Sequence, residues 1–279
     1  MDFSIITPSY RNNAWLQLCV ASVADQQGVT HEHIVQDAGS DDGTLDWLPK
    51  DPRVRAFIEK DAGMYDAINR GLRRANGDLL AYLNCDEQYL PGALAAVKEF
   101  FTQHPDVELV FADAVVVDAD GRFVACRKVV RPFPAHVRTA HLPTLTCATF
   151  FRRRLIECRS LFFDPDWRAL GDAIWVLAAQ QQGVRMDILR RYTSVFTRTG
   201  QNLSFLPPAL REKQKLRALA PAWQRALAPV WVARHRLEKI RRGCYRQAPF
   251  EFSLYTPASP RQRTTVTVTR PGARIPTEH

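Results

Sequence analysis

The first 113 residues alternate short β-type runs with helix-type runs, and this alternation constrains the fold more than any other feature of the chain. The predicted strands are Phe3–Thr7, His31–Gln36, Arg55–Glu59, Leu79–Leu83 and Val107–Ala112, and the predicted helices are Ala14–Gln27, Met64–Ala75 and Pro91–Gln103. Such alternation implies right-handed βαβ crossovers. We therefore expect an α/β fold, with a mostly parallel sheet covered by helices on both faces.

The pattern is looser beyond residue 113. Asp118–Gly121 has the composition of a tight turn, and it predicts a hairpin between Ala114–Val117 and Phe123–Arg127. Thr144–Phe151 is a further candidate strand, and Asp172–Gln182 is a candidate helix.

The charge of the chain changes near Pro207-Pro208. The chain as a whole carries +9, but residues 206–279 hold 15 Lys and Arg against 4 Asp and Glu, which leaves residues 1–205 at −2. The sequence therefore predicts one domain over residues 1–205 and a basic C-terminal extension over residues 206–279. A basic extension on a near-neutral body favours contact with an anionic surface, either lipid or nucleic acid.

Residues 223–242 combine apolar side chains at helical spacing with many arginines. This is the composition of a helix that lies at a membrane interface, where each basic residue gains about 1 kcal/mol from anionic lipid. Packing of the aromatic side on the body, with only the arginines in water, is an equal alternative. Phe250–Thr256 and Thr264–Arg270 resemble the strands of a hairpin, to which the sequence assigns no function.

The six cysteines contain no CxxC pair. This spacing argues against a disulfide framework and against structural zinc, and it fits a reducing cytoplasm. No signal peptide and no apolar run of about 18 residues is visible, so we expect a cytoplasmic protein that the extension can hold on the inner face of the plasma membrane.

Polar side chains follow four of the predicted strands directly. They are Pro8-Ser9-Tyr10, Asp37 with the run 39–44, Asp61-Ala62-Gly63 and Asn84-Cys85-Asp86-Glu87. In a parallel sheet these segments meet at the rim where ligands bind. A rim rich in acids but without Lys or Arg holds phosphate well only through a bridging divalent cation. Asp86 is the best-placed cation ligand; the alternative is a cap on the following helix.

On a helix over Met64–Ala75, Ile68 and Leu72 share one face, while Asp66 and Asn69 lie on the opposite face. The simplest interpretation of this pattern is an amphipathic helix whose polar face is in water.

The stretches SIITPSYRN, EHIVQDAGSDDGT, EKDAGMYDAINRGLRRANGDLLAYLNCDE and ALGDAIWVLAAQQQG resemble the family 2 glycosyltransferases with the GT-A fold. The similarity covers about residues 3–205, and it is closest to bacterial members that assemble surface polysaccharides and glycolipids. GMYDAINRG followed by LNCDE is its most specific part. The resemblance implies a Rossmann-like sheet and inverting transfer of a sugar from a nucleotide donor, most often a UDP-sugar, to a glycan or lipid-linked acceptor.

The resemblance also implies roles for single residues. Pro8, Ser9 and Tyr10 would line the nucleotide pocket, and Asp37 would accept a hydrogen bond from the nucleobase. Asp66 would help to shape the pocket near the ribose and the sugar.

Asn69, like Asp66, would help to shape the pocket near the ribose and the sugar. Asn84 stands at the first position of the family's DxD motif and would contact the donor, and Asp86 would bind Mg²⁺ or Mn²⁺. Asp172 lies where the family has its general base, although an N-cap of the following helix is an alternative for this residue. Asn84 and Glu87 replace the usual aspartates, so the metal site has one carboxylate fewer.

Three other functions compete with this interpretation. A nucleic-acid-binding protein is disfavoured because the body is slightly acidic and no helix-turn-helix, zinc or RNA-sheet motif is present. An oxidoreductase is excluded because no GxGxxG follows the first strand. A degenerate scaffold that binds the donor without turning it over stays open, because of Asn84 and Glu87.

Overall fold

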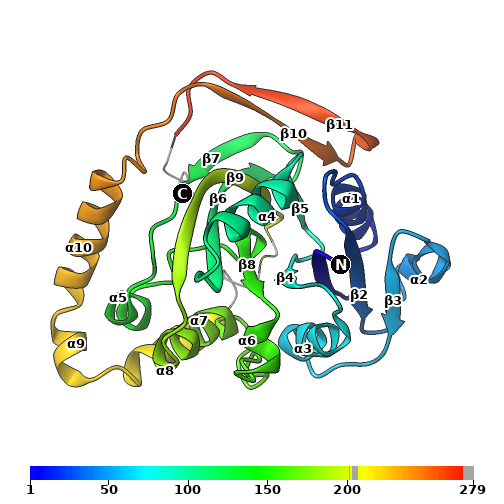
Figure 1. The fold of residues 1–279 in the computed structure, drawn as a ribbon. Coiled ribbons are helices and arrows are strands. Elements are labelled where there is room, and N and C mark those ends of the chain that lie inside the picture. The colour runs from blue at the N-terminus through cyan, green and yellow to red at the C-terminus, as the bar shows by residue number, and fades with distance from the viewer. Residues whose placement is uncertain (201, 203–206, 273–279) are drawn as a thin grey trace.

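The computed structural model describes residues 1–200, 202 and 207–272, in which helices surround one large, curled sheet (Figure 1). The strands are β1 (Phe3–Ser9), β2 (His31–Asp37), β3 (Arg55–Ile58), β4 (Leu79–Tyr82), β5 (Glu87–Tyr89), β6 (Leu109–Asp118), β7 (Phe123–Arg127), β8 (Thr149–Arg152), β9 (Met186–Arg198), β10 (Phe250–Thr256) and β11 (Ser259–Val268).

The helices are α1 (Asn13–Ala24), α2 (Thr44–Trp47), α3 (Met64–Arg74), α4 (Ala93–Gln103), α5 (Pro134–Thr139), α6 (Arg154–Glu157), α7 (Gly171–Gln181), α8 (Pro207–Ala218), α9 (Ala222–Ala226) and α10 (Ala228–Arg241), with 3₁₀ turns η1 (Leu48–Lys50) and η2 (Thr146–Ala148). None of the helices in the described residues is both long and apolar enough to span a bilayer.

The sheet has two halves that differ in strand direction. Its order is β3-β2-β1-β4-β8-β6-β9-β5, with β7 beside β6. The first four strands are parallel, as the alternation predicts, and Ile6 of β1 lies between Ile34 and Tyr82. Beyond β4 the sheet is mixed, since β8 and β5 run antiparallel to their neighbours while β6 and β9 are parallel.

Alternate residues of the strands face two separate cores. Phe3 and Ile5 point to the face covered by α1 and α4, whereas Ile6 points to the face covered by α3, α6 and α7. The helices fit closely: a Cβ on Gly71 would lie 2.4 Å from the Ile6 side chain. The prediction of helices on both faces is therefore confirmed.

Three local predictions need correction. Val107–Ala112 and Ala114–Val117 belong to one long strand, β6. Thr144–Phe151 contains the turn η2, and the strand β8 begins only at Thr149. Asn69 is buried rather than in water, because a later segment of the chain packs against that side of α3.

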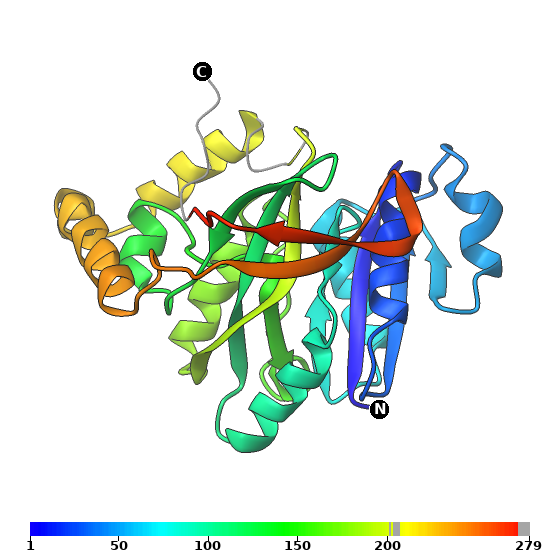
Figure 2. The ribbon, with the colours of Figure 1, turned by 90° about the horizontal axis from the view of Figure 1, so that it is seen from above.

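The C-terminal segment wraps around the body instead of extending from it (Figure 2). Leu216 of α8 packs with α5 and α7 in one apolar cluster. The hairpin β10–β11 packs Phe252 and Leu254 on β6 and β9. Arg263 of the hairpin pairs with Asp25 at the end of α1, at 2.6 Å. The boundary predicted at 205/206 lies outside the described residues.

Candidate active site

A cavity of about 1440 Å³ lies beyond the carboxyl ends of β1 and β4, between these strands and the helices α5, α7 and α8. Six of the predicted site residues line it: Pro8, Ser9, Tyr10, Asn84, Asp86 and Asp172. The fold thus brings segments that are far apart in the sequence to one cavity, as the rim argument predicts for the first five.

The end of β1 forms one wall. Ser9 is buried, and its hydroxyl has no hydrogen-bond partner among the described residues. Tyr10 is 51% exposed, with the Arg11 guanidinium 5.1 Å from its ring centre. A buried hydroxyl without a partner costs stability unless a ligand satisfies it. This wall therefore has the chemistry of a binding surface.

Asp37 does not line the cavity. It is fully buried at the end of β2, where one carboxylate oxygen accepts the backbone N–H groups of Gly39 and Ser40 at 2.9 and 2.7 Å. The other oxygen accepts the Ser40 hydroxyl at 2.8 Å. These bonds fix the loop after β2, whose residue Ala38 does line the cavity.

Asp66 and Asn69 also lie outside the cavity lining. Asp66 accepts the N–H of Ala62 at 3.0 Å and pairs with Arg70 at 2.8 Å. Asn69 donates to the carbonyl of Phe163 and accepts its N–H, at 2.7 and 2.9 Å. Both residues hold segments together behind the wall, and neither contacts the open space of the cavity.

The turn after β4 carries Asn84 and Asp86. Asp86 does not cap a helix, because β5 follows it and α4 begins only at Ala93. Burial raises its pKa, and its Oδ2 accepts the Asn202 side-chain amide at 3.2 Å. Glu87 points inward, where its carboxylate accepts the Asn84 N–H at 2.9 Å and burial raises its pKa.

The donor set of this turn fits a divalent cation. The side-chain oxygen of Asn84 is buried without a partner in the part of the chain that the structure describes. Asn84 and Asp86 both line the cavity. Hard cations such as Mg²⁺ and Mn²⁺ prefer amide and carboxylate oxygens.

Asp172 lies in the first turn of α7 but is not its N-cap, which is Leu170. Its Oδ1 accepts the N–H of Ala173 at 2.8 Å, and burial raises its pKa to about 6. The Tyr65 hydroxyl accepts the Asp172 N–H at 3.1 Å. Gly171 allows this approach, since a Cβ there would lie 2.5 Å from the Tyr65 ring.

The C-terminal segment contributes side chains that sequence reasoning missed. Glu212 of α8 accepts the N–H groups of Arg168, Ala169 and Leu170, at 2.6, 2.9 and 2.8 Å. It thereby holds the loop that leads into Asp172. No local pattern marks this residue, because its partners lie in a distant part of the sequence.

Basic side chains also line the cavity, and because Lys60 lies two residues after the end of β3, the expectation of a rim without Lys or Arg is corrected. They are Lys60, Arg138, Arg168, Lys213 and Arg217. Two of the five come from α8, so the basic extension supplies positive charge to the same space as the acidic rim. Such charge favours an anionic ligand.

The sequence pattern of the family described as "Glycosyl transferase family 2" matches residues 4–158. A relative, "PGL/p-HBAD biosynthesis glycosyltransferase" of Mycobacterium bovis (strain BCG / Pasteur 1173P2), is 35% identical over 127 residues. These residues are 43% of this chain and 50% of the relative, so the match spans half the length of that protein.

Two solved structures share the fold. TarS 1–349 of S. aureus in complex with UDP-GlcNAc has a TM-score of 0.62 at 18% identity, over 86% of this chain and 73% of that one. The mannosyltransferase PcManGT of Pyrobaculum calidifontis in complex with GDP-Man and Mn²⁺ has a TM-score of 0.53 at 18% identity, over 87% and 79%. At these identities the likeness establishes the GT-A-like fold alone.

Proposed function

The chain belongs to glycosyl transferase family 2, and on that premise we propose that it is an inverting glycosyltransferase. It transfers a sugar from a nucleoside-diphosphate donor, a UDP-sugar, to a hydroxyl of a glycan or lipid-linked acceptor in the synthesis of surface polysaccharide or glycolipid. The observation that carries the proposal is the single cavity that Asp86 and Asp172 both line, one at the strand ends and the other at the start of α7.

The nucleotide lies against the end of β1 in this proposal. Pro8 and Tyr10 offer apolar surface, and the unpaired Ser9 hydroxyl offers a hydrogen bond. Asp37 keeps the neighbouring loop in place, and because its carboxylate is fully buried it meets the nucleobase only if that loop moves. The solved relative bound to UDP-GlcNAc supports uridine as the base.

Asp86 and Asn84 would hold the divalent cation, and the relative solved with Mn²⁺ supports its presence. When bound, the cation supplies Lewis-acid stabilisation of the charge that develops on the leaving diphosphate. Lys213 and Arg217 add positive charge to the same cavity. These two side chains stabilise the diphosphate directly, so less of its charge has to be neutralised by a cation that is held with one carboxylate fewer.

Asp172 acts as the general base. With a pKa of about 6 it is mostly ionised at pH 7, and it is basic enough to accept the proton of the attacking hydroxyl. The proton moves from the acceptor oxygen to the carboxylate as that oxygen attacks the anomeric carbon. Attack from the face opposite the leaving diphosphate inverts the configuration at that carbon.

We also propose that α9 and α10 place the protein on an anionic membrane surface, on its cytoplasmic side. Leu237 and Ile240 of α10 and Trp223 of α9 are each more than half exposed, and arginines lie between them. No side chain of α10 is buried. For the rest of the extension the structure supports the other alternative, packing on the body: α8 and the hairpin β10–β11 both pack on residues of the body.

The proposed activity is tested by release of nucleoside diphosphate from a panel of nucleotide sugars, with and without Mn²⁺. We expect release from a UDP-sugar that Asp172→Asn lowers by about 100-fold or more while donor affinity is kept. Asp120→Asn, in an exposed turn, is the matched control. A donor that binds but is never turned over by the wild type would establish the degenerate scaffold instead.

A further inference from the structure

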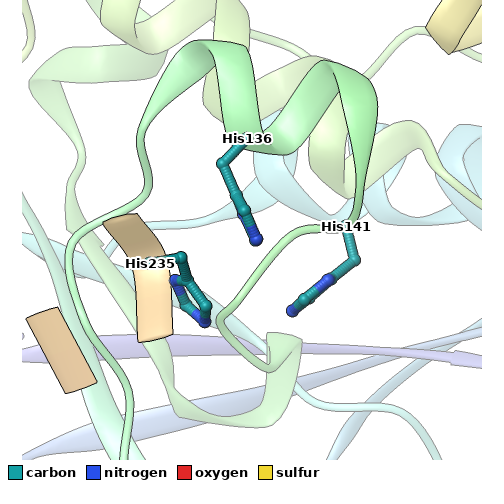
Figure 3. A group of neighbouring side chains, drawn as sticks. All are labelled: His136, His141 and His235. Atoms are coloured by element: carbon teal, nitrogen blue, oxygen red, sulfur yellow. The ribbon is translucent and has the colours of Figure 1, made fainter. Parts of the chain in front are cut away.

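Three histidines from two distant segments meet beside α10 (Figure 3). His136 lies on α5, His141 follows that helix, and His235 lies on α10. One ring nitrogen from each lies within 4.8 Å of those of the other two. The rings of His136 and His235 are stacked at 4.2 Å, and the His141 ring meets His136 edge-on at 4.6 Å.

The hydrogen bonds of the cluster do not explain it. His136 is 1% exposed, and neither of its ring nitrogens has a hydrogen-bond partner within the described residues. Leaving both ring nitrogens buried without partners is costly unless a ligand outside the protein chain binds there. The imidazoles of His141 and His235 lie next to His136, so they are placed to bind the same ligand.

Imidazole has an ordinary pKa of about 6.5, so histidine side chains are mostly neutral near pH 7 and each ring has a lone pair available. Neutral imidazole is a preferred ligand of Zn²⁺ and of other late first-row transition metals.

We propose that His136, His141 and His235 form a transition-metal site, of the kind that Zn²⁺ occupies, which fastens α10 to α5 and to the wall of the cavity. Zinc–nitrogen bonds of about 2.0–2.1 Å in a tetrahedral site need ring nitrogens about 3.4 Å apart. Imidazole lone pairs lie in the ring plane, so the stacked rings of His136 and His235 must turn out of parallel for both to direct a nitrogen at one ion. Three protein ligands leave the fourth position to water or to another small ligand.

The surroundings decide which metals fit. Lys239 lies one helical turn after His235 on α10, so its positive charge repels a cation bound at the cluster. A hard ion such as Mg²⁺, which prefers oxygen ligands, is therefore disfavoured. A metal that forms strong bonds to nitrogen overcomes this repulsion. The site is thus distinct in chemistry from the oxygen ligands at Asp86.

The site matters for the cavity because of where its ligands lie. His141 itself lines the cavity, as do Arg138 and Leu142 beside it. On the other side, the ring of Trp231 on α10 lies 5.6 Å from that of Phe133, the residue directly before α5. A metal at this position therefore joins the exposed helix α10 to the wall of the active site. This inference does not depend on the proposed transfer activity.

The test uses untagged full-length protein, freed of metal with a chelator and titrated with Co²⁺ in excess Mg²⁺. We expect the strong visible absorption of tetrahedral Co²⁺, displaced by Zn²⁺, and a Tm raised by about 5 °C or more at 100-fold excess of Zn²⁺ over its Kd. Since loss of a partner outside the coordination shell already weakens metal binding about 10- to 100-fold, His235→Ala and His141→Ala should each weaken it by at least about 100-fold.

His104→Ala is the matched control, because His104 stacks on Phe100 of α4 and lies outside the cluster. The absorption should persist in this variant, and also in Asp86→Ala, which removes the other proposed metal ligand. His141 is exposed, so its replacement tests the site without disturbing a buried side chain. No tetrahedral absorption in the wild type, or unchanged absorption in both His235→Ala and His141→Ala, would overturn the proposal.

Discussion

The strand-end loops of residues 1–90 and the segment 207–272 both line or support the same cavity, but they are specified in different ways. The loops follow directly from the parallel strands that carry them, and their acids stand where the alternation of strands and helices places them. The later segment reaches the cavity through packing: Glu212 holds the loop before Asp172, and His235 meets α5. The local sequence pattern determines how the first region reaches the cavity, and tertiary contacts determine how the second region does.

The largest expected effect lies in the first region. Asp86→Ala should lower sugar transfer by about 10³-fold, because electrostatic stabilisation of the leaving group is worth that much in active sites. Donor affinity should fall mainly when Mn²⁺ is present, which calorimetry with and without the ion measures. If metal dependence is unchanged in the variant, Asp86 is not the metal ligand. Asp120→Ala, which removes the same charge in an exposed turn, is the control and should leave transfer unchanged.

A change in the later segment should come next. In Glu212→Gln an NH₂ group replaces one carboxylate oxygen. An NH₂ group donates hydrogen bonds and cannot accept the backbone N–H groups that Glu212 holds, so the loop before Asp172 shifts. Displacement of a catalytic group by about 1 Å costs up to about 100-fold in turnover. We expect kcat to fall with little change in donor affinity. Glu238→Gln, on α10, should leave kcat unchanged, and equal effects of both variants would remove the distinction between α8 and α10.

The pH dependence connects the later segment to Asp172, which lies between the two regions in the sequence. Because the carboxylate of Asp172 must be ionised to accept a proton and its pKa is raised to about 6, kcat should fall about 10-fold from pH 7 to pH 5. The negative charge of Glu212 contributes to that raised pKa. In Glu212→Gln the fall of kcat at acidic pH should therefore move to lower pH. If kcat falls at the same pH in both proteins, Asp172 is not the group that titrates.

The smallest effect is expected on the exposed side of α10. Ile240→Ser should weaken binding to vesicles that contain anionic lipid by about 5-fold, or about 1 kcal/mol, which is part of the value of a fully buried isoleucine. Binding should also fall as salt rises. Donor hydrolysis in solution should not change. Equal binding to neutral and anionic vesicles, or tighter binding to DNA, would contradict the membrane proposal.

The sequence predicted what local chemistry determines. The parallel order of β1–β4 and the meeting of Ser9 and Asp86 at one cavity follow from alternation and strand direction. The resemblance added Asp172, which no spacing argument reaches. Where neighbours come from elsewhere in the chain, prediction was incomplete: Asn69 is buried because Phe163 packs against it.

The proposed metal site also depends on neighbours from distant parts of the chain. The absence of paired cysteines argues against structural zinc, and all six cysteines are free, five of them buried. The histidine cluster carries no comparable spacing signal, because His136 and His235 become neighbours only after α10 has packed on α5. Sequence spacing detects metal ligands within one segment, and it misses sites assembled from two.

The contact between Arg263 and Asp25 has a consequence for synthesis. The two residues are 238 positions apart, and a ribosome adds about 5–20 residues per second, so Asp25 waits on the order of 10 to 50 s for its partner. Val195 lies 73 positions before Val268 at the end of β11, so the surface formed by Val115, Val117 and Val195 lacks the cover of the hairpin for about 4 to 15 s of synthesis. An apolar sheet surface left open in the nascent chain is a target for chaperones and for aggregation. We expect the nascent chain to need protection until the hairpin has emerged.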